Sequence, residues 1–329
     1  MNYYRFHLDN TRPNRLFTCP SCNHKTLKRY VDEENNQYLP QDVGRCNREV
    51  NCGYHFTPKH YFSDHFALPE RPPNAILPLP RKPPAQTFID KGLMQRTLSA
   101  NANNHFKSYL KTLFGPEPAG YLAEKFLIGT SKHWPGAVIF WQINVRGQIH
   151  AGKVMLYDAS SGKRVKKPYD HIQWVHALQK WPDFKLHQCF FGLHQLANVP
   201  TSQPIAVVES EKTAILMTLI FPKYVWLASG GMGLQEDKFE PLAKRKIILF
   251  PDAGIDRGQG TPYEKWLLKA EVLQKADYDV SVSTLVEKAA TGTQRQQGFD
   301  LADYLIQQDP DFGWALTEND YPVFWNTNF

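Results

Sequence analysis

Four cysteines near the start of the chain have the types and spacing of a structural zinc site. They are Cys19 and Cys22 in CPSC, and Cys46 and Cys52 in CNREVNC. Two residues between the first pair let both thiolates meet one ion, and four thiolates fill a tetrahedral site. Five residues separate the second pair, which is wider than an ideal knuckle, so His24 or His55 is an alternative ligand.

Zinc is favoured over four unrelated buried cysteines, because a segment this small and polar needs a bound metal or another cross-link in order to fold. The clustering also favours a metal over disulfides in a chain that we expect to be intracellular. Cys189 stands apart from the cluster and is expected to be a small core residue.

Acidic residues follow two predicted strands farther along the chain and indicate a second metal site. Glu209 ends the apolar run PIAVVE, and Asp252 ends KIILFPD. Ligands of an open α/β sheet bind beyond the carboxyl ends of its strands, so neighbouring strands would bring both carboxylates into one crevice. Asp300 and Asp303 in GFDLADYL, near the start of the last predicted helix, would complete the group.

Converging carboxylates repel one another unless a cation neutralises them, and Mg²⁺ or Mn²⁺ suits an all-oxygen site. Simpler structural roles exist for three of the four residues. Asp252 can cap a turn, while Asp300 and Asp303 can cap the last helix and complement its dipole. Glu209 is harder to explain in this way, because it directly follows Val207 and Val208.

An alternation of strands and helices from residue 204 onward would position these carboxylates. Strands are predicted over PIAVVE, YVWLAS, KIILFPD and DVSVSTLV, and helices over SEKTAILMTLI, LQEDKFEPLAK, TPYEKWLLKAEVLQKA and DLADYLIQQ. Repeated β-α units imply a parallel sheet with helices on both faces. Ser210 is the expected N-cap of the first helix. The backbone of SGGMGL could approach a phosphate at a helix N-terminus, but the stretch matches neither a Walker loop nor a dinucleotide fingerprint, and a tight turn is the preferred interpretation.

The chain as a whole is predicted to be α/β, with five parts. They are a zinc ribbon over 1–66, a Pro-rich linker over 67–86, a helical and β-rich basic region over 87–200, the parallel sheet over 201–310 and a C-terminal tail over 311–329. Seven prolines in the linker exclude helix and central strand there. Residues 137–158 alternate apolar and polar side chains about an RG turn, which predicts a β-hairpin.

The positive charge of the chain is concentrated in its middle. The net charge is +6, and residues 131–190 hold nine Lys or Arg against three acids, a surplus of the same size. A basic stretch among aromatic residues suits a polyanion such as single-stranded DNA, although a solvated surface fits it as well. Candidate contacts are Arg146, Lys153, Lys163, Arg164, Lys166, Lys167 and Lys212, with Trp141, Tyr157, Tyr169, Trp174 or Trp181 available for base stacking.

Hydropathy indicates a chain that stays out of membranes. No run approaches the roughly 18–20 apolar residues of a transmembrane helix. The first residues, MNYYRFHLDNTRPNR, lack the apolar core of a signal peptide. The chain has 329 residues, of which 42% are hydrophobic, enough for two or three domains. We therefore expect a soluble, cytoplasmic protein with no membrane partner.

The order of these parts resembles a Toprim domain, the catalytic module of bacterial primases, topoisomerases and some nucleases. A strand ending in Glu209, a helix, a strand, a glycine loop, a helix and a strand ending in Asp-x-Gly carry the resemblance. The zinc ribbon and the β-rich region ahead of it are similar to primases specifically, and above all to primase-like proteins of bacterial mobile elements. The resemblance spans roughly residues 15–310 and implies a role in DNA replication, with a replicative helicase as a candidate partner.

By this resemblance, Glu209 is the Toprim acid/base glutamate and Asp252 is the first aspartate of an Asp-x-Asp metal motif. The chain departs from the family at Gly254, which stands where the second aspartate belongs. Asp256 lies two residues farther along, and Asp300 or Asp303 is the other candidate to complete the Mg²⁺ site. A smaller ligand set would weaken or remove a second metal.

Three functions remain open on these grounds. The first is a primase-like nucleotidyltransferase acting on single-stranded DNA, which Glu209 and Asp252 favour. The second is a catalytically degenerate Toprim and zinc-ribbon module that binds DNA, which Gly254 favours. The third is a Toprim nuclease, which the ribbon and the β-rich middle disfavour.

Overall fold

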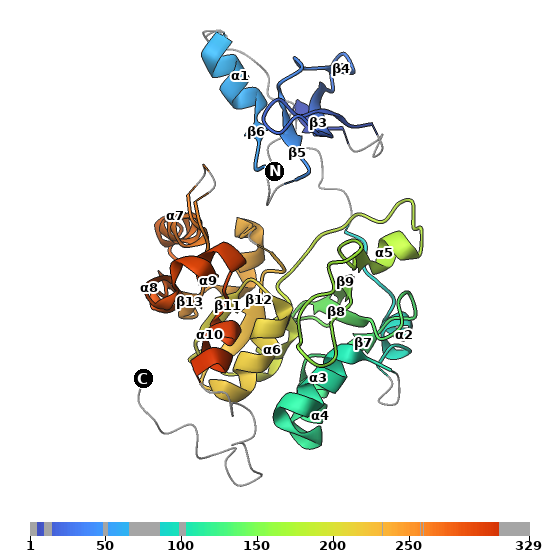
Figure 1. Ribbon diagram of the computed structural model, residues 1–329, viewed down its shortest axis with the longest axis vertical. Coiled ribbons are helices and arrows are strands. Elements are labelled where there is room, and N and C mark those ends of the chain that lie inside the picture. Colours follow the sequence, from blue (N-terminus) through green and yellow to red (C-terminus); the bar gives the residue numbers. More distant parts are fainter. Residues whose placement is uncertain are drawn as a thin grey trace. The chain divides into compact units, whose positions relative to one another are not determined.

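The computed structural model describes residues 5–9, 15–48, 52–65, 86–98, 103–231, 233–256, 258 and 260–308 (Figure 1). The described residues fall into two compact units, the first drawn from residues 1–85 and 256–259 and the second from the remainder. The predicted C-terminal tail, and the predicted linker apart from Gln86, lie outside the described residues.

The first unit is a small antiparallel β-structure built around one long strand. β3 (Lys25–Asp32) pairs with β1 (Phe6–Leu8), β2 (Phe17–Thr18), β4 (Gln37–Tyr38) and β5 (Gly44–Cys46), β5 pairs with β6 (His55–Phe56), and α1 (Pro58–His65) follows. Cys19 and Cys46 are buried beside Leu27, so the cysteines themselves form part of its core. A core of this kind depends on what the cysteines bind.

A four-stranded parallel sheet forms the centre of the second unit. Its order is β12 (Val225–Ala228), β11 (Ile205–Val208), β13 (Ile247–Leu249) and β14 (Val280–Val282), and each neighbouring pair is parallel. The α/β class and the parallel sheet are therefore confirmed. β11 and β13 are neighbours, as the predicted carboxylate site requires.

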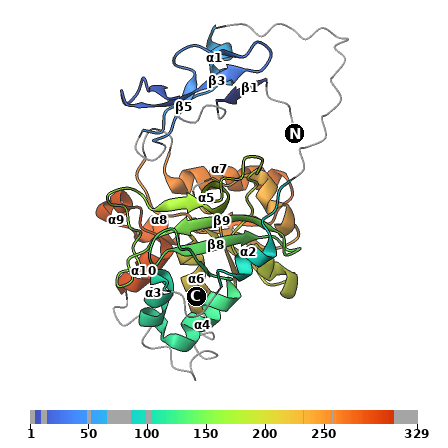
Figure 2. The same ribbon diagram turned by 90° about the vertical axis from the view of Figure 1, so that its right-hand side faces the viewer.

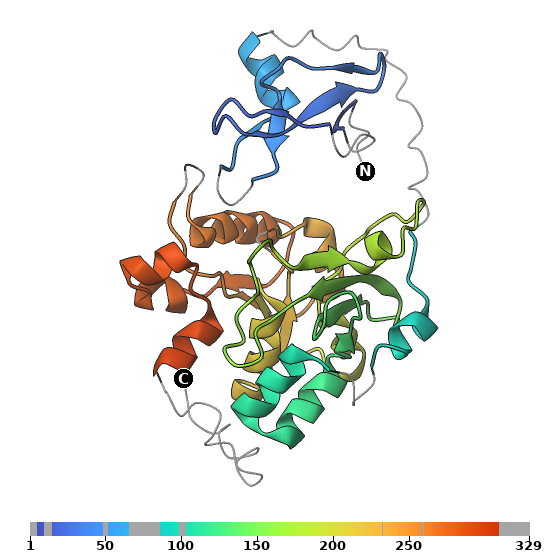
Figure 3. The ribbon, with the colours of Figure 1, turned by 45° about the vertical axis from the view of Figure 1, so that its right-hand side comes forward.

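Helices cover both faces of this sheet, because alternate residues of β11 enter two different cores. Ala206 and Val208 pack with α6 (Glu211–Ile220) and α10 (Leu301–Gln308). Ile205 and Val207 pack instead with residues of α7 (Pro262–Lys275), and Figure 3 shows the two layers on opposite sides of the strands. A strand buried on both faces reads as the unbroken apolar run seen in the sequence.

An antiparallel sheet adjoins the parallel one within the second unit. Its order is β10 (Ile172–Trp174), β9 (Ile149–Met155), β8 (Val138–Ile143) and β7 (Gly129–Thr130), with α3 (His105–Phe114) and α4 (Pro116–Lys125) packed together beside it (Figure 2). The predicted hairpin is confirmed, and the polar residues of its alternating pattern are buried along with the apolar ones. Every residue of β8 and β9 is buried, since one face meets the α3–α4 core and the other meets α2 (Lys91–Gln95) and α5 (Val175–Leu178).

Three local predictions in the parallel-sheet region need correction. The predicted helix LQEDKFEPLAK is a short 3-10 helix, η2 (Glu236–Leu242), because Pro241 lies inside it and has no N–H to donate. The strand predicted over DVSVSTLV ends at Val282 and gives way to α8 (Leu285–Ala289), and α9 (Gly292–Gln297) was not predicted. Ser210 does cap α6, accepting a hydrogen bond from the N–H of Thr213.

In the part of the chain that the structure describes, no helix has the length and apolar character needed to cross a bilayer.

Candidate metal and nucleic-acid sites

The four predicted zinc ligands lie together in the first unit. Their Sγ atoms are all within 4.8 Å of one another, with Cys19 and Cys52 3.7 Å apart and Cys22 and Cys46 4.0 Å apart. A tetrahedral zinc ion with Zn–S bonds of about 2.3 Å separates its sulfurs by about 3.8 Å, so the cluster fits this ion. Between the second pair, the carbonyl of Arg48 accepts a hydrogen bond from the N–H of Cys52 at 2.7 Å.

Neither alternative histidine belongs to this group. The ring of His24 lies 2.6 Å from the carbonyl of Cys22, and that of His55 lies 2.8 Å from the hydroxyl of Tyr30. Burial raises the pKa of Cys19 to about 11, whereas the backbone N–H of His24 lowers the pKa of Cys22 to about 6. Zinc binding would draw both thiols into the thiolate form and release protons.

The predicted carboxylates meet at the C-terminal edge of the parallel sheet. Glu209 directly follows β11, and Asp252 lies three residues after the neighbouring β13. The backbone N–H of Ala253 donates to the carbonyl of Phe299 at 2.8 Å, which brings Asp300 to the same edge. Residues far apart in the sequence thus form one acidic group.

Burial and mutual repulsion dominate the electrostatics of this acidic group. Burial, and then the charge of Asp300, raises the pKa of Glu209 to about 7. Burial also raises the pKa of Asp252 well above its usual value, and the charges of Glu209 and Asp300 add to this rise. Among the described residues, no hydrogen-bond donor reaches the buried Oε1 of Glu209. Burial and repulsion thus outweigh the favourable charges that act on Glu209 and Asp252, because the net shift of both pKa values is upward.

Asp300 and Asp303 also cap the start of α10, as the structural alternative anticipated. The N–H of Asp303 donates to Oδ1 of Asp300 at 2.8 Å, and the hydroxyl of Thr213 donates to its Oδ2 at 2.7 Å. Burial and the charge of Asp300 raise the pKa of Asp303. Capping does not exclude metal binding, because each carboxylate oxygen has more than one lone pair.

Three cations lie around the acidic group. Lys212 pairs with Asp303 at 3.4 Å; burial acts to lower its pKa, but the charges of Asp300 and Asp303 outweigh burial and raise it. The positive charges of Lys265 and Arg164 both oppose the rise in the pKa of Glu209. The site thus combines acids that repel one another with bases that would attract a phosphate.

The acidic group is not closed around one ion in the way that the cysteines are. Among the described residues, the four cysteines are the one set of three or more Cys, His, Asp or Glu ligand atoms gathered within 4.8 Å. A side chain at Gly254 would also collide, since a Cβ there would lie 2.7 Å from two ring carbons of Pro262. Asp256 is exposed and accepts a hydrogen bond from the N–H of Gly258.

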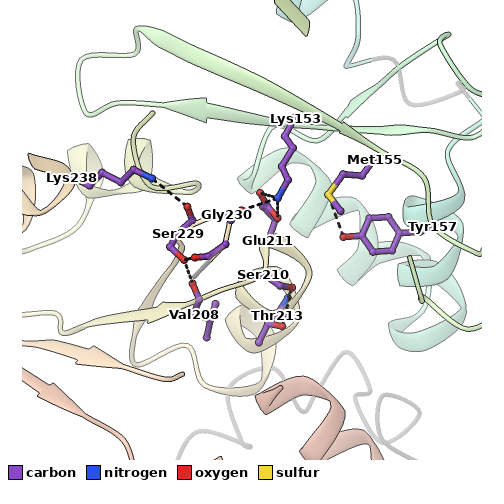
Figure 4. A network of polar contacts seen from close by, with 11 residues as sticks. Lys153, Met155, Tyr157, Val208, Ser210, Glu211, Thr213, Ser229, Gly230 and Lys238 are labelled. Atoms are coloured by element: carbon purple, nitrogen blue, oxygen red, sulfur yellow. Dashed lines mark hydrogen bonds and ion pairs between the residues drawn. The ribbon is translucent and has the colours of Figure 1, made fainter. Parts of the chain in front are cut away.

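A buried ion pair beside this edge corrects the predicted role of Lys153. Its Nζ lies 3.0 and 3.2 Å from the two carboxylate oxygens of Glu211, and donates to the carbonyl of Gly230 at 3.1 Å (Figure 4). The side chain of Glu211 is only 2% exposed. With its three donors engaged inside the protein, Lys153 is not a surface contact for nucleic acid.

The glycine loop after β12 is held by this pair and by a second lysine. Lys238 donates to the carbonyl of Ser229 at 3.4 Å, and burial lowers the pKa of Lys238. Gly230 has a φ of +79°, and a Cβ there would lie 3.3 Å from the carboxylate of Glu211. The loop is therefore a tight turn that needs glycine, as predicted, and its carbonyls face the lysines.

The other predicted nucleic-acid contacts lie largely on the surface. Arg146, Lys163, Arg164, Lys166 and Lys167 are exposed. The aromatic candidates divide sharply, because Trp141 and Tyr157 are buried, whereas the side chain of Tyr169 is 56% exposed. Trp174 and Trp181 are partly buried.

Sequence reasoning missed Glu211, Lys265 and Thr213 as parts of the site. Glu211 looked like an ordinary first-turn acid that complements the helix dipole. One signal did exist, since Lys153 interrupts the otherwise apolar or small-residue run AGKVM. A lysine inside a fully buried strand requires a buried partner.

Comparison with known families matches two separate stretches of the chain. Residues 4–67 match the family described as a zinc beta-ribbon finger, in agreement with the four-cysteine site. Residues 104–253 match the family described as Domain of unknown function (DUF6371), a stretch that includes Glu209 and Asp252. A search of curated proteins found no match.

Among solved structures, the chain is similar to several primase domains. A DnaG primase catalytic domain bound to ssDNA is 15% identical, with 66% of this chain and 80% of that chain covered and a TM-score of 0.42. The zinc-binding and RNA polymerase domains of Aquifex aeolicus primase are 15% identical, with 66% and 57% covered and a TM-score of 0.43. The primase fragment of the bacteriophage T7 primase-helicase is 14% identical, with 82% and 88% covered and a TM-score of 0.37.

Proposed function

We propose that this chain is a primase-like protein that binds single-stranded DNA and carries out Mg²⁺-dependent phosphoryl transfer. The observation that carries the proposal is the mutually repelling group of the partly buried Glu209 and Asp252 and the buried Asp300 at the C-terminal edge of a parallel sheet. Carboxylates whose charged forms are disfavoured by burial and by one another cost stability, so a group of them is expected to serve a ligand. The proposal extends to primer synthesis in the replication of a mobile element, beside a replicative helicase.

The donor set of this group fits a hard divalent cation. Oε1 of Glu209 is buried and receives no hydrogen bond from the described residues, and carboxylate oxygen is the ligand that Mg²⁺ and Mn²⁺ prefer. Asp252, with Asp300 or Asp303, would hold the ion alongside Glu209. When bound, Mg²⁺ would stabilise the negative charge that develops during phosphoryl transfer.

The protein's own residues would divide the remaining work. Where Asp252 and Asp300 or Asp303 hold the ion without it, Glu209, whose pKa in the metal-free protein is about 7, would take a proton from the attacking hydroxyl near neutral pH. Lys212, Lys265 and Arg164 would attract and orient phosphates beside the carboxylates. The exposed Lys163 and Lys166 continue this positive charge along the surface, where a DNA strand would lie.

One observation favours a second candidate, a DNA-binding module without catalysis. Pro262, which opens α7, occupies the space that a side chain at Gly254 would need. An aspartate cannot enter this position unless α7 moves, so the Asp-x-Asp pair of Toprim enzymes is incompatible with this local packing. A single-metal enzyme and a binding module both accommodate that loss, and a Toprim nuclease remains the third candidate.

Calorimetric titration of the whole chain with Mg²⁺ and Mn²⁺ tests the proposal, with and without a single-stranded DNA template. The variants are Glu209→Gln and Asp252→Asn, and the control is Glu236→Gln, an exposed carboxylate paired with Lys269. We expect binding in the wild type and the control, and its loss in both site variants. The same proteins are then assayed for template-dependent incorporation of ribonucleotides.

The outcomes separate the three candidates. Nucleotide incorporation that requires Glu209 and Asp252 supports the primase-like enzyme, whereas metal-dependent cleavage without incorporation would select a nuclease. Salt-sensitive DNA binding with neither activity, and with no metal bound at the sheet edge, would select the binding module and overturn catalysis.

A further inference from the structure

We propose that Tyr169 and the rings behind it form a stacking platform for one base of a single-stranded DNA. The inference rests on the proposed nucleic-acid binding and adds a site at which the strand is gripped. Of the five aromatic residues considered from the sequence, Tyr169 has the most exposed side chain, at 56%. A ring that is largely open on the surface is available to a base, whereas a buried ring is not.

The ring of Tyr169 is already stacked from one side. His171 lies against it, with the ring centroids 4.5 Å apart and the planes inclined by 21°. Trp134 meets His171 edge-on at 5.0 Å, and His133 lies 4.4 Å from Trp134. Since His171 covers one face of the tyrosine and the side chain stays half exposed, the opposite face can receive a base.

The loop that carries Tyr169 is closed at its base. The N–H of His171 donates to the carbonyl of Val165 at 3.3 Å, and the N–H of Val165 donates to the carbonyl of Leu156 at 3.0 Å. His171 itself is buried, with its Nδ1 3.2 Å from the carbonyl of Val165. A ring held in place before binding loses little conformational freedom when a base stacks on it.

Positive charge surrounds this platform. Residues 166–170 are all exposed, and they include Lys166 and Lys167 next to Tyr169. Lys132 and His133 are exposed at the other end of the ring series. One acid, Asp170, follows the tyrosine, so two lysines and one acid flank it within residues 166–170, and this balance suits a phosphate backbone.

The platform is continuous with the acidic group through the same loop. Arg164 lies five residues before Tyr169 on this loop and is exposed, and its positive charge opposes the rise in the pKa of Glu209. Tyr157 and Arg164 form an isolated β-bridge that fixes the loop at this end. A strand with one base on Tyr169 would therefore find the exposed Lys166 and Arg164 on the same loop as contacts for its phosphates.

Fluorescence anisotropy with a labelled oligothymidylate tests the platform on the whole chain. Tyr169→Ala should weaken binding about ten-fold, and Tyr169→Phe should bind like the wild type, because stacking needs the ring and not its hydroxyl. Tyr121→Ala is the matched control, since Tyr121 is a 49% exposed tyrosine beside Lys125 on α4. It should leave binding unchanged.

An abasic oligomer of the same length separates stacking from a change in folding or charge. The wild type and Tyr169→Ala should bind it with equal, weaker affinity. The platform is wrong if Tyr169→Ala binds oligothymidylate as tightly as the wild type does. It is also wrong if the variant loses as much affinity for the abasic oligomer as for oligothymidylate. In both cases DNA binding itself stands. If the wild type binds neither oligomer, the platform and the proposed DNA binding both fail.

Discussion

The zinc ribbon and the acidic edge of the parallel sheet assemble charged ligands in opposite ways. The four sulfurs come from two short segments of one small β-structure and are gathered within 4.8 Å. The carboxylates come from segments that are far apart in the sequence. For example, Asp300 accepts a hydrogen bond from Thr213, which lies 87 residues earlier on α6 beside Glu209. The four thiolates supply a full tetrahedral ligand set. The carboxylates, in contrast, repel one another, and a bound cation would reduce this repulsion. The contrast separates a structural metal site from a candidate reactive one.

Loss of a single cysteine gives the largest expected effect. Cys46→Ser should release zinc and unfold residues 15–56, because zinc contributes on the order of 10 kcal/mol to domains of this kind. Metal analysis measures the zinc, and hydrogen exchange localises the unfolding. Cys189→Ser, a buried cysteine in the second unit, should keep the metal. Full protection of the β3 amides in zinc-free Cys46→Ser would show that the ribbon is not metal-dependent.

Breaking the buried pair of Lys153 and Glu211 should have the next largest effect. Lys153→Met leaves the carboxylate of Glu211 buried without its cation, which typically costs about 3–5 kcal/mol of unfolding free energy. Denaturant unfolding measures the loss. Lys269→Met, which breaks the more exposed pair with Glu236, should cost less than about 1 kcal/mol.

The double variant Lys153→Met with Glu211→Leu sharpens the contrast between a compensated and an uncompensated carboxylate. It should recover much of the lost stability, because no buried charge remains. If the single variant Lys153→Met is as stable as the wild type, Glu211 is not the ionised partner that the geometry indicates.

The pH dependence of stability should reveal the uncompensated carboxylate Glu209. Its pKa is raised from 4.5 to about 7 in the folded protein, so the folded state binds the extra proton between these values. Stability is therefore present at low pH and is lost as pH rises through 7, by about 3 kcal/mol for 2.5 units. Glu209→Gln should remove this component, so that metal-free wild type and variant are alike near pH 5 and diverge by pH 8.

Mg²⁺ extends this test to the proposed site. Excess Mg²⁺ should restore the stability of the wild type at pH 8 and leave Glu209→Gln unchanged, because the ion stabilises the state that binds it. Parallel pH profiles for the two metal-free proteins would contradict the assigned repulsion.

The parts of the site that the sequence predicted depend on local signals. Cys19 and Cys22 are close in the chain, and Glu209 and Asp252 each end an apolar run whose register is set by burial on both faces. Burial on both faces made the strands recognisable, and the β-α alternation predicted a parallel sheet, but the order β12-β11-β13 comes from the structure.

The parts that the sequence could not predict depend on tertiary contacts. The partner of Lys153 lies 58 residues away on another element, and nothing local marks Glu211 as that partner. The exclusion of a side chain at Gly254 depends on where α7 begins, at Pro262. The polar residues of β8 and β9 gave an alternating pattern, yet packing on both faces of the sheet buries them all.

The smallest expected effect concerns the hydroxyl that holds Asp300 in the acidic group. Thr213→Val removes the donor to Oδ2 of Asp300 with little change of shape, and should cost about 1 kcal/mol of stability. It should also weaken Mg²⁺ binding about ten-fold, because a ligand loses orientation when its hydrogen-bond partner is removed. Thr218→Val is the matched control on the same helix, since its buried hydroxyl donates to the carbonyl of Ala214. Calorimetry compares the Mg²⁺ affinities of the two variants. If Thr213→Val binds Mg²⁺ as tightly as Thr218→Val does, Asp300 serves only to cap α10. The acidic group would then consist of Glu209 and Asp252 alone.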